Sequence, residues 1–272
     1  MASSPDYSPD IRFMAFQSYL TAPHLFGQLN GLNYSFAGKT VADIGTGLGI
    51  LAYLLKDKNA LKIVGIDINK SFLKAARHLI KDKNTGFINA NGFKIPVKDC
   101  IFDIVFARYV FQHINLSGDF ISEIKRVLKP GGLLAVIDIE DDLNISYPDL
   151  PESTKNLFRI YSEYQKEQGG DRFISKKIPA FLSSAGFEDI ELNPCTAVFF
   201  KGKDDGLNSA ALKNAFLLVQ NELGLVKKNL LDDKFIGPAE FHKGLNDYFK
   251  FLNMENNLFI SKTEFIITCK KN

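Results

Sequence analysis

Residues 41–49 read Val-Ala-Asp-Ile-Gly-Thr-Gly-Leu-Gly, and this stretch decides how the rest of the chain is interpreted. A short apolar run that ends in glycines is typical of a buried strand turning into a helix, where the backbone can pass close to a ligand. The G-x-G-x-G spacing differs from the G-x-G-x-x-G pattern that seats a pyrophosphate on a helix N-terminus. The carboxylate of Asp43 would repel phosphates and would suit an ammonium group. A plain tight turn is the alternative interpretation.

Short apolar strands and amphipathic helices alternate around and after this turn. We expect strands over 40–44, 61–66, 86–90, 102–107 and 132–139, and helices over 50–56, 71–83 and 119–128. This alternation predicts a parallel sheet, because helical crossovers bury parallel strands on both faces. Ligands of such sheets bind at the carboxyl ends of the strands, so residues directly after each strand are the candidates for a site.

The flanking parts of the chain have other patterns. A loose arm over 1–10 precedes a helix over 11–30 that Pro23 breaks. A proline-rich loop is expected over 147–150. We expect further helices over 157–168, 175–185, 208–223 and 239–253, and long strands over 190–201 and 258–268.

The composition is that of an ordinary globular protein, with 272 residues, 46% hydrophobic and 24% charged. It excludes a disordered chain, a collagen-like fibre and a coiled-coil rod. With 33 basic and 31 acidic residues, the formal net charge of +2 provides no global field that would attract nucleic acid.

Cysteine usage and hydropathy bear on location. Cys100, Cys195 and Cys269 are widely spaced, and no Cys or His cluster has metal-ligand spacing, so we predict a reduced chain without a bound metal. The N-terminus lacks the basic and apolar regions of a secretion signal, and no stretch reaches the ~20 apolar residues that span a bilayer. We therefore expect a cytoplasmic protein that does not associate with membranes.

Polar residues follow the second and third expected strands. Asp67 lies at the position where an acidic side chain can accept both hydroxyls of a ribose, although it could also cap the next helix, for which Asn69 is better placed. Asn91 and Gly92 could read an adenine edge, or could form a simple Asn-Gly turn. Together with Asp43, these positions describe a pocket for an amino-acid end, a ribose and an adenine without a phosphate anchor.

The chain resembles the class I S-adenosylmethionine-dependent methyltransferases, within their small-molecule branch. The resemblance rests on five motifs in the expected order, at 41–49, 65–69, 89–96, 102–114 and 128–140. It implies a doubly wound α/β fold with a mostly parallel, seven-stranded, Rossmann-like sheet, an antiparallel last strand and helical cap insertions. It also implies methyl transfer from S-adenosylmethionine by in-line displacement to a small molecule.

The resemblance assigns the cofactor contacts residue by residue. Asp43 would lie near the methionine ammonium, and Asp67 would hold the ribose hydroxyls. The backbone of Arg108, rather than its guanidinium, would contact the ammonium. The other contacts fall to Gly45, Thr46 and Gly47 beneath the methionine and sulfonium, Ile68 against the adenine, and Asn91 and Gly92 at the adenine edge, where the family more often has Asp at position 91.

Candidates for the acceptor side are fewer. His113 is the best candidate for a base that takes a proton from an oxygen acceptor, and a structural histidine is the equal alternative. Asp138 and Glu140 share one face of their strand and could contact the substrate, or line a solvated loop. With Asp141 and Asp142 they could also gather a divalent ion, which their spacing alone does not support.

The expected organisation is an N-terminal helical cover over 1–37, a cofactor-binding core over 38–140, a lid helix with the continuing sheet over 141–202, a helical cap insertion over 203–257 and a last strand over 258–272. Tyr19 of the cover would lie over the cofactor or simply pack on the sheet. Phe and Tyr recur mostly outside the cofactor motifs, which favours a hydrophobic cap over a pocket for an apolar or aromatic substrate.

Two other functions stay open. One is a nicotinamide-dinucleotide-dependent oxidoreductase on a related fold, against which the glycine spacing and Asp43 argue. The other is a methyltransferase that acts on a macromolecule, either tRNA or protein, although no basic run marks a nucleic-acid surface. We expect no nucleic-acid partner, and the sequence leaves open whether the chain forms a homodimer.

Overall fold

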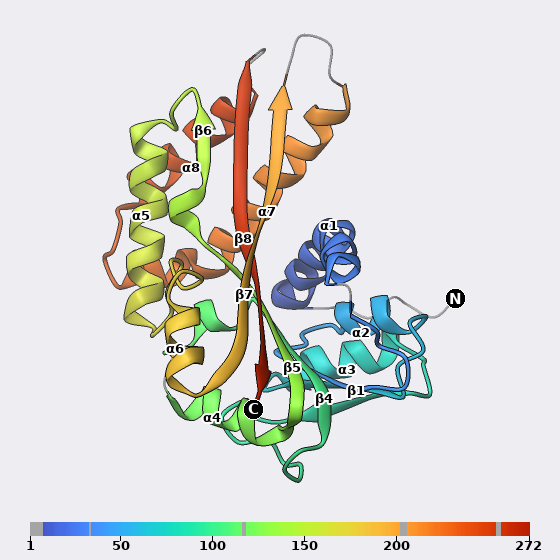
Figure 1. The fold of residues 1–272 in the computed structure, drawn as a ribbon. Helices are drawn as coiled ribbons and strands as arrows, with labels where there is room; N and C mark the ends of the chain where they lie inside the picture. Colours follow the sequence, from blue (N-terminus) through green and yellow to red (C-terminus); the bar gives the residue numbers. More distant parts are fainter. Residues whose placement is uncertain (1–7, 33, 116–117, 202–205, 254–256) are drawn as a thin grey trace.

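The computed structural model describes residues 8–32, 34–115, 118–201, 206–253 and 257–272, with the side chains of residues 206–212 excepted. The first seven residues of the expected arm and the expected start of the cap insertion at residue 203 lie outside these ranges. Figure 1 shows one continuous sheet with helices on its faces, and a separate group of helices beside the long last strands.

Five strands make up the parallel part of the sheet, in the spatial order β3-β2-β1-β4-β5. They are β1 (Thr40–Ile44), β2 (Lys62–Asp67), β3 (Thr85–Asn89), β4 (Phe102–Arg108) and β5 (Leu128–Ile139). The predicted parallel sheet is thereby confirmed. The strand order reverses between β1 and β4, and this switch point is where open α/β sheets bind their ligands.

The last strand, β8 (Leu258–Lys271), runs antiparallel to β5, as predicted. Along its other side it pairs with β7 (Phe187–Lys201), also antiparallel. The sheet has eight strands rather than the expected seven, because the short β6 (Ile145–Tyr147) pairs with Phe259–Ser261 of β8. β8 is long enough to extend past the end of β5, so its outer edge is available to this extra strand.

The helices differ from expectation mainly in their lengths. α1 (Pro9–Gly31) is one helix that continues through Pro23, because the buried Leu25 and Leu29 after the proline still pack against the sheet. α7 (Gly206–Asp232) is nine residues longer at its C-terminal end than the expected 208–223. The other helices are α2 (Ile50–Leu55), α3 (Lys70–Leu79), α4 (Gly118–Val127), α5 (Glu152–Glu167), α6 (Ile178–Ser184) and α8 (Pro238–Leu252).

Three hydrophobic clusters hold these layers together. One lies between the sheet and α4 and α6, and another lies between the sheet and α1 and α2. The third joins α5, α7, α8 and the outer half of β8, and buries Leu157, Leu223, Phe241 and Leu258. Each fully buried side chain of this size contributes about 1.5–3 kcal/mol, so the third cluster anchors the helices that stand beside the sheet in Figure 1.

A half-buried carboxylate ties α1 to the sheet. Glu264 of β8 accepts hydrogen bonds from the Tyr109 hydroxyl at 2.9 Å and from the Gln28 side chain at 3.3 Å, and its carboxylate lies 3.4 Å from Nε2 of His24. α1 is thereby held over the ends of β1 and β4. Within the described residues, no helix is both long and apolar enough to cross a bilayer.

Candidate functional site

The glycine turn after β1 has a backbone that only glycine adopts easily. Gly45 has a φ of 72° and Gly47 a φ of 53°, both in the left-handed region. A Cβ on Gly45 would lie 2.4 Å from Cγ2 of Val110, and one on Gly47 would lie 2.8 Å from Cε of Met14. The turn therefore packs closely beneath α1 and the segment after β4.

The end of β2 is tied to this turn through Asp67. Oδ2 of Asp67 accepts a 2.9 Å hydrogen bond from the amide of Gly47, and Oδ1 accepts one of 2.8 Å from the amide of Asn69. The side chain of Asn69, rather than that of Asp67, caps α3 by accepting from Ser71 and Phe72. Asp67 is half-buried, so lone pairs of its carboxylate can still accept further hydrogen bonds from a ligand.

Asp43 and Arg108 lie side by side at the ends of β1 and β4. Burial raises the pKa of Asp43 to about 7, against the attraction of the Arg108 guanidinium, which lowers it. Nε and Nη2 of Arg108 are buried and have no hydrogen-bond partner among the described residues. Its guanidinium carbon lies 4.1 Å from the ring centre of Tyr109. A buried carboxyl group near a buried guanidinium that lacks hydrogen-bond partners suits a ligand that carries both a positive and a negative group.

These residues line a cavity of about 520 Å³, which we call the glycine-loop cavity. Its wall includes six of the predicted cofactor residues, Asp43, Gly45, Thr46, Gly47, Asp67 and Arg108, together with the predicted base His113. The volume lies in the range of roughly 300–1,000 Å³ that is usual for small-molecule sites.

The structure does not bring Tyr19 to this cavity. Its side chain is 76% exposed, whereas Phe13, Met14, Gln17 and Ser18 of the same helix line the cavity. These four positions recur at helical spacing and define the face of α1 that covers the glycine turn, and Tyr19 lies beside this face.

The residues predicted for the adenine lie outside the wall of the glycine-loop cavity. Ile68 is 70% exposed. Oδ1 of Asn91 accepts a 3.0 Å hydrogen bond from the amide of Phe93, which forms the turn of the alternative interpretation. A Cβ on Gly92 would lie 2.8 Å from Cε2 of Phe120, so close packing requires glycine there.

His113 ends a single 3₁₀ turn, η1 (Phe111–His113), and its ring faces the glycine-loop cavity. Although His113 is exposed, desolvation by the surrounding protein lowers the pKa of its imidazole. The carboxylate of Glu222 opposes this shift, and Arg172 adds to it. His113 is therefore neutral at pH 7 and can accept a proton.

Asp138 and Glu140 are buried, so the structure does not place them where a substrate would contact them. Asp138 accepts hydrogen bonds from the amides of Gln112 and Ile139 at 3.2 and 3.0 Å, which positions the turn carrying His113. Glu140 accepts from the amide of Lys176 at 3.0 Å and pairs with its ammonium at 3.2 Å. Both carboxylates hold neighbouring segments in place.

The next two carboxylates along the chain are also neutralised. Asp141 pairs with Arg172 at 2.5 Å, and Asp142 pairs with Lys176. The four acidic residues therefore have different surroundings: Asp138 accepts from backbone amides, Glu140 and Asp142 both pair with Lys176, and Asp141 pairs with Arg172. In the described part of the chain, no group of three or more His, Cys, Asp or Glu residues could hold a metal ion.

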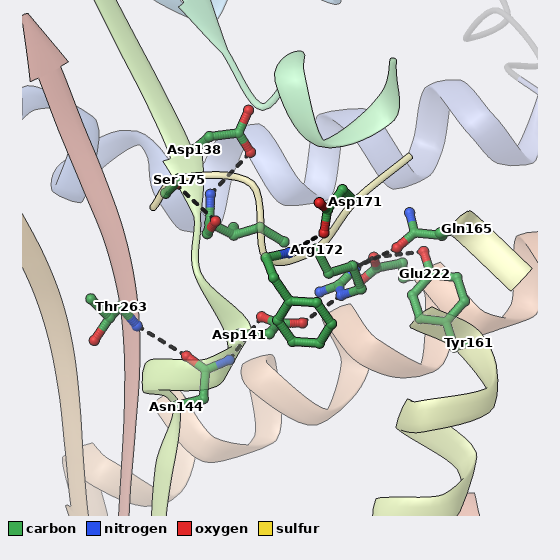
Figure 2. Close-up of polar contacts among 12 residues, drawn as sticks. Asp138, Asp141, Asn144, Tyr161, Gln165, Asp171, Arg172, Ser175, Glu222 and Thr263 are labelled. Carbon is green, nitrogen blue, oxygen red and sulfur yellow. Dashed lines mark hydrogen bonds and ion pairs between the residues drawn. The ribbon is translucent and has the colours of Figure 1, made fainter. Parts of the chain in front are cut away.

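Arg172 is the centre of a polar cluster that the sequence did not reveal. Figure 2 shows its guanidinium between Asp141 on one side and Gln165 and Glu222 on the other. Oε1 of Glu222 accepts a hydrogen bond of 3.1 Å from Nη1 of Arg172 and one of 2.9 Å from the hydroxyl of Tyr161. Burial and the neighbouring Glu222 raise the pKa of Tyr161 above its ordinary value, so the hydroxyl stays protonated and donates.

A second cavity of about 520 Å³ lies on the far side of this cluster, and we call it the side cavity. It is enclosed by α5, α7, α8 and the outer parts of β6 and β8. Its apolar lining includes Leu150, Phe158, Val219, Leu223, Tyr248 and Ile260, together with Ile145 and Phe173. Of the described residues, Tyr161 and Glu222 line both cavities.

Comparison with known proteins gives one family. Residues 42–136 match the family model described as a methyltransferase domain. The ubiquinone/menaquinone biosynthesis C-methyltransferase UbiE of Stutzerimonas stutzeri is 33% identical over 181 residues, which cover 58% of this chain and 69% of UbiE. The O-methyltransferase resE of Aspergillus sclerotiorum is 28% identical over 130 residues, so the match spans 46% of this chain and about half, 49%, of resE.

The fold is also similar to that of a solved methyltransferase. Phosphoethanolamine N-methyltransferase 2 of Haemonchus contortus, in complex with S-adenosyl-L-methionine, matches with a TM-score of 0.55 and 21% identity. The match covers 90% of this chain and 51% of that chain. At this identity the similarity concerns the fold alone.

Proposed function

We propose a cofactor, a substrate class and a reaction for this chain, which belongs to the class I S-adenosylmethionine-dependent methyltransferases. The chain binds S-adenosylmethionine in the glycine-loop cavity and methylates a small, largely apolar or aromatic molecule. The observation that carries the proposal is the convergence of Asp43, Arg108 and the Gly47–Asp67 pair on one cavity.

The charges of the glycine-loop cavity fit the cofactor. The methionine end of S-adenosylmethionine has an ammonium and a carboxylate, for which Asp43 and the unsatisfied nitrogens of Arg108 are suitable partners. The guanidinium of Arg108 thus adds to the contact that we expected from its backbone. Asp67 is available to ribose hydroxyls, and Ile68, Asn91 and Gly92 stay candidates for the adenine end. When bound, the cofactor supplies an electrophilic methyl group.

The outer end of the cavity fits an apolar acceptor. Tyr161, Tyr164, Leu225 and Val226 of α5 and α7 line it opposite the glycine turn. His113 lines the same cavity and is neutral, so its imidazole can take a proton from an acceptor hydroxyl as the oxygen is methylated. UbiE and resE, which the chain resembles in part, are named as a quinone-pathway C-methyltransferase and an O-methyltransferase, which supports a small cyclic acceptor.

A labelling experiment tests this function. The purified chain is incubated with methyl-deuterated S-adenosylmethionine and with 1,4-naphthohydroquinone or 4-hexylphenol, and the products are analysed by mass spectrometry. We expect S-adenosylhomocysteine and an acceptor that carries the deuterated methyl group, with neither formed by the Asp67→Ala variant. Binding of S-adenosylmethionine without its consumption across phenols, quinols and amines would contradict the proposed activity.

A further inference from the structure

We propose that the side cavity holds the body of the methyl acceptor, and that Glu222 receives a hydroxyl of that acceptor where the two cavities meet. This inference rests on the proposed function, because it names the substrate class of the same site. The acceptor class is a neutral apolar molecule that carries a hydroxyl group at one end.

The position of Glu222 is the first observation. It lies on α7, and its carboxylate lines both cavities. Oε1 accepts from both Tyr161 and Arg172, whereas Oε2 has no hydrogen-bond partner among the described residues. The side chain is 26% exposed, so Oε2 is open to the cavities rather than enclosed by protein. A charged acceptor atom in this position can receive a donor from a ligand.

The neighbourhood of Glu222 directs that donor toward the reaction site. His113 lines the glycine-loop cavity, and its pKa responds to the charges of Glu222 and Arg172, so the three side chains are close enough to interact electrostatically. A hydroxyl bound at Oε2 would therefore lie at the edge of the cavity that His113 faces. The rest of the molecule would extend from there into the side cavity.

The lining of the side cavity identifies the acceptor's body. Apolar side chains line its walls, and they include residues of α5, α7, α8, β8 and the loop before α5. Such walls favour burial of a ring or an alkyl chain, at about 25 cal/mol for each Å² of apolar surface removed from water.

The charges of the lining favour a neutral acceptor over a cationic one. The basic residues are Arg159, Lys166, Arg172, Lys177 and Lys262, and the acidic ones are Asp141, Glu163, Asp171 and Glu222. Arg159, Arg172 and Lys177 have acidic partners, whereas Lys166 and Lys262 have no ion-pair partner in the described ranges. An amine would meet this excess of positive charge, so a neutral hydroxyl is the donor that suits Glu222.

Titration calorimetry with paired probes tests the inference. The full chain is saturated with S-adenosylhomocysteine and titrated with 4-hexylphenol, or with 4-hexylanisole, which lacks the hydroxyl donor. Glu222→Gln keeps the shape of the side chain and removes its charge. We expect this variant to bind 4-hexylphenol at least about tenfold more weakly, since hydrogen bonds to charged groups are worth about 1.5–3 kcal/mol. Its affinity for 4-hexylanisole changes less than twofold.

A second variant tests the location. Ser162 of α5 lines the side cavity but not the glycine-loop cavity. Ser162→Trp therefore fills the side cavity and should weaken the binding of both probes at least tenfold. Ser183→Trp, at an exposed site on α6, is the matched control and should leave both affinities unchanged. Absence of 4-hexylphenol binding to the wild type, equal responses of the two probes to Glu222→Gln, or unchanged binding by Ser162→Trp would overturn the inference. Failure of the wild type to bind S-adenosylhomocysteine would instead overturn the proposed function.

Discussion

The amide of Gly47 donates a 2.9 Å hydrogen bond to Oδ2 of Asp67, which joins the turn after β1 to the end of β2. These two residues are separated by 20 positions in the sequence. The bond fixes the position of a carboxylate beside a backbone that only glycine allows. It therefore sets the geometry of the edge of the cavity where we propose that the cofactor binds.

Asp67→Asn should weaken the binding of S-adenosylhomocysteine at least about tenfold, because an amide accepts hydrogen bonds less strongly than a carboxylate and its amino group opposes the donating amides. Titration calorimetry measures the loss. Asp57→Asn is the matched control and should bind as the wild type does, because the Asp57 side chain is exposed and has no hydrogen bond to any described residue. Equal affinities for the two variants would mean that Asp67 has only a structural role.

The affinity for S-adenosylhomocysteine should fall as the pH is lowered from 7 to 5.5. Burial raises the pKa of Asp43 to about 7, so the carboxylate becomes protonated in this range. The ligand's ammonium favours the ionised form, so binding must release a proton, and each pH unit below the pKa costs up to about tenfold in affinity. Calorimetry in buffers of different ionisation enthalpy measures the released proton. Asp43→Asn should bind more weakly and without this pH dependence, and a pH-dependent variant would show that another group is responsible.

Ionisation of Asp138 should make the protein less stable as the pH rises from about 4 to about 7. Burial raises its pKa from 3.8 to about 7, so its contribution to the free energy of unfolding is fully present below about pH 4 and is lost as the pH rises through 7. Between pH 5 and pH 8 the loss is on the order of 2 kcal/mol. Asp138→Asn cannot ionise. Between pH 5 and pH 8, urea denaturation should therefore show its free energy of unfolding rising by this amount relative to that of the wild type. A stability difference that stays constant with pH would refute the assignment.

Arg172→Ala should destabilise the protein by about 3 kcal/mol, because it leaves Asp141 and Glu222 without their shared partner in a largely buried cluster. Arg159→Ala is the matched comparison. Its ion pair with Glu163 is solvent-exposed, and its loss should cost less than about 1 kcal/mol. Chemical denaturation of both variants measures the difference. Similar costs for the two would mean that the Arg172 cluster contributes no more than a surface pair.

The parallel half of the fold could be predicted because its signals are local. The apolar runs that form β1 and β4 begin at the expected residues, and the glycines end β1 as the G-x-G-x-G spacing indicates. The extra strand β6 could not be predicted, since three residues pair with β8 only because β8 extends beyond β5. Its existence depends on a contact between segments more than 110 residues apart.

The site was predictable only where a strand ends. Asp43 and Asp67 follow this rule, and both line the glycine-loop cavity. Tyr19 and Gln17 differ by two positions on one helix, and the sequence does not show which of them faces the cavity. No local sequence pattern marks Glu222 as a site residue, because its surroundings depend on Arg172, 50 residues away, and on the position of α7 beside the sheet.

The buried pair Asp138 and Glu140 shows a further limit. Strand alternation predicts that both carboxylates share one face of β5 and its continuation, but it does not show that other segments bury them. Asp138 accepts from the amide of Gln112, which precedes β5 in the sequence, and Glu140 accepts from the amide of Lys176, which follows it. Alternation indicates which side chains share a face, and only the assembled fold shows what covers it.

Titration calorimetry of the full chain with S-adenosylhomocysteine and, separately, with NAD tests the central claim most directly. The account predicts that one S-adenosylhomocysteine binds per chain, that S-adenosylmethionine competes with it, and that NAD does not bind. Binding of NAD in the absence of S-adenosylhomocysteine binding would contradict the account, because the G-x-G-x-G turn with Asp43 beside it differs from a pyrophosphate site.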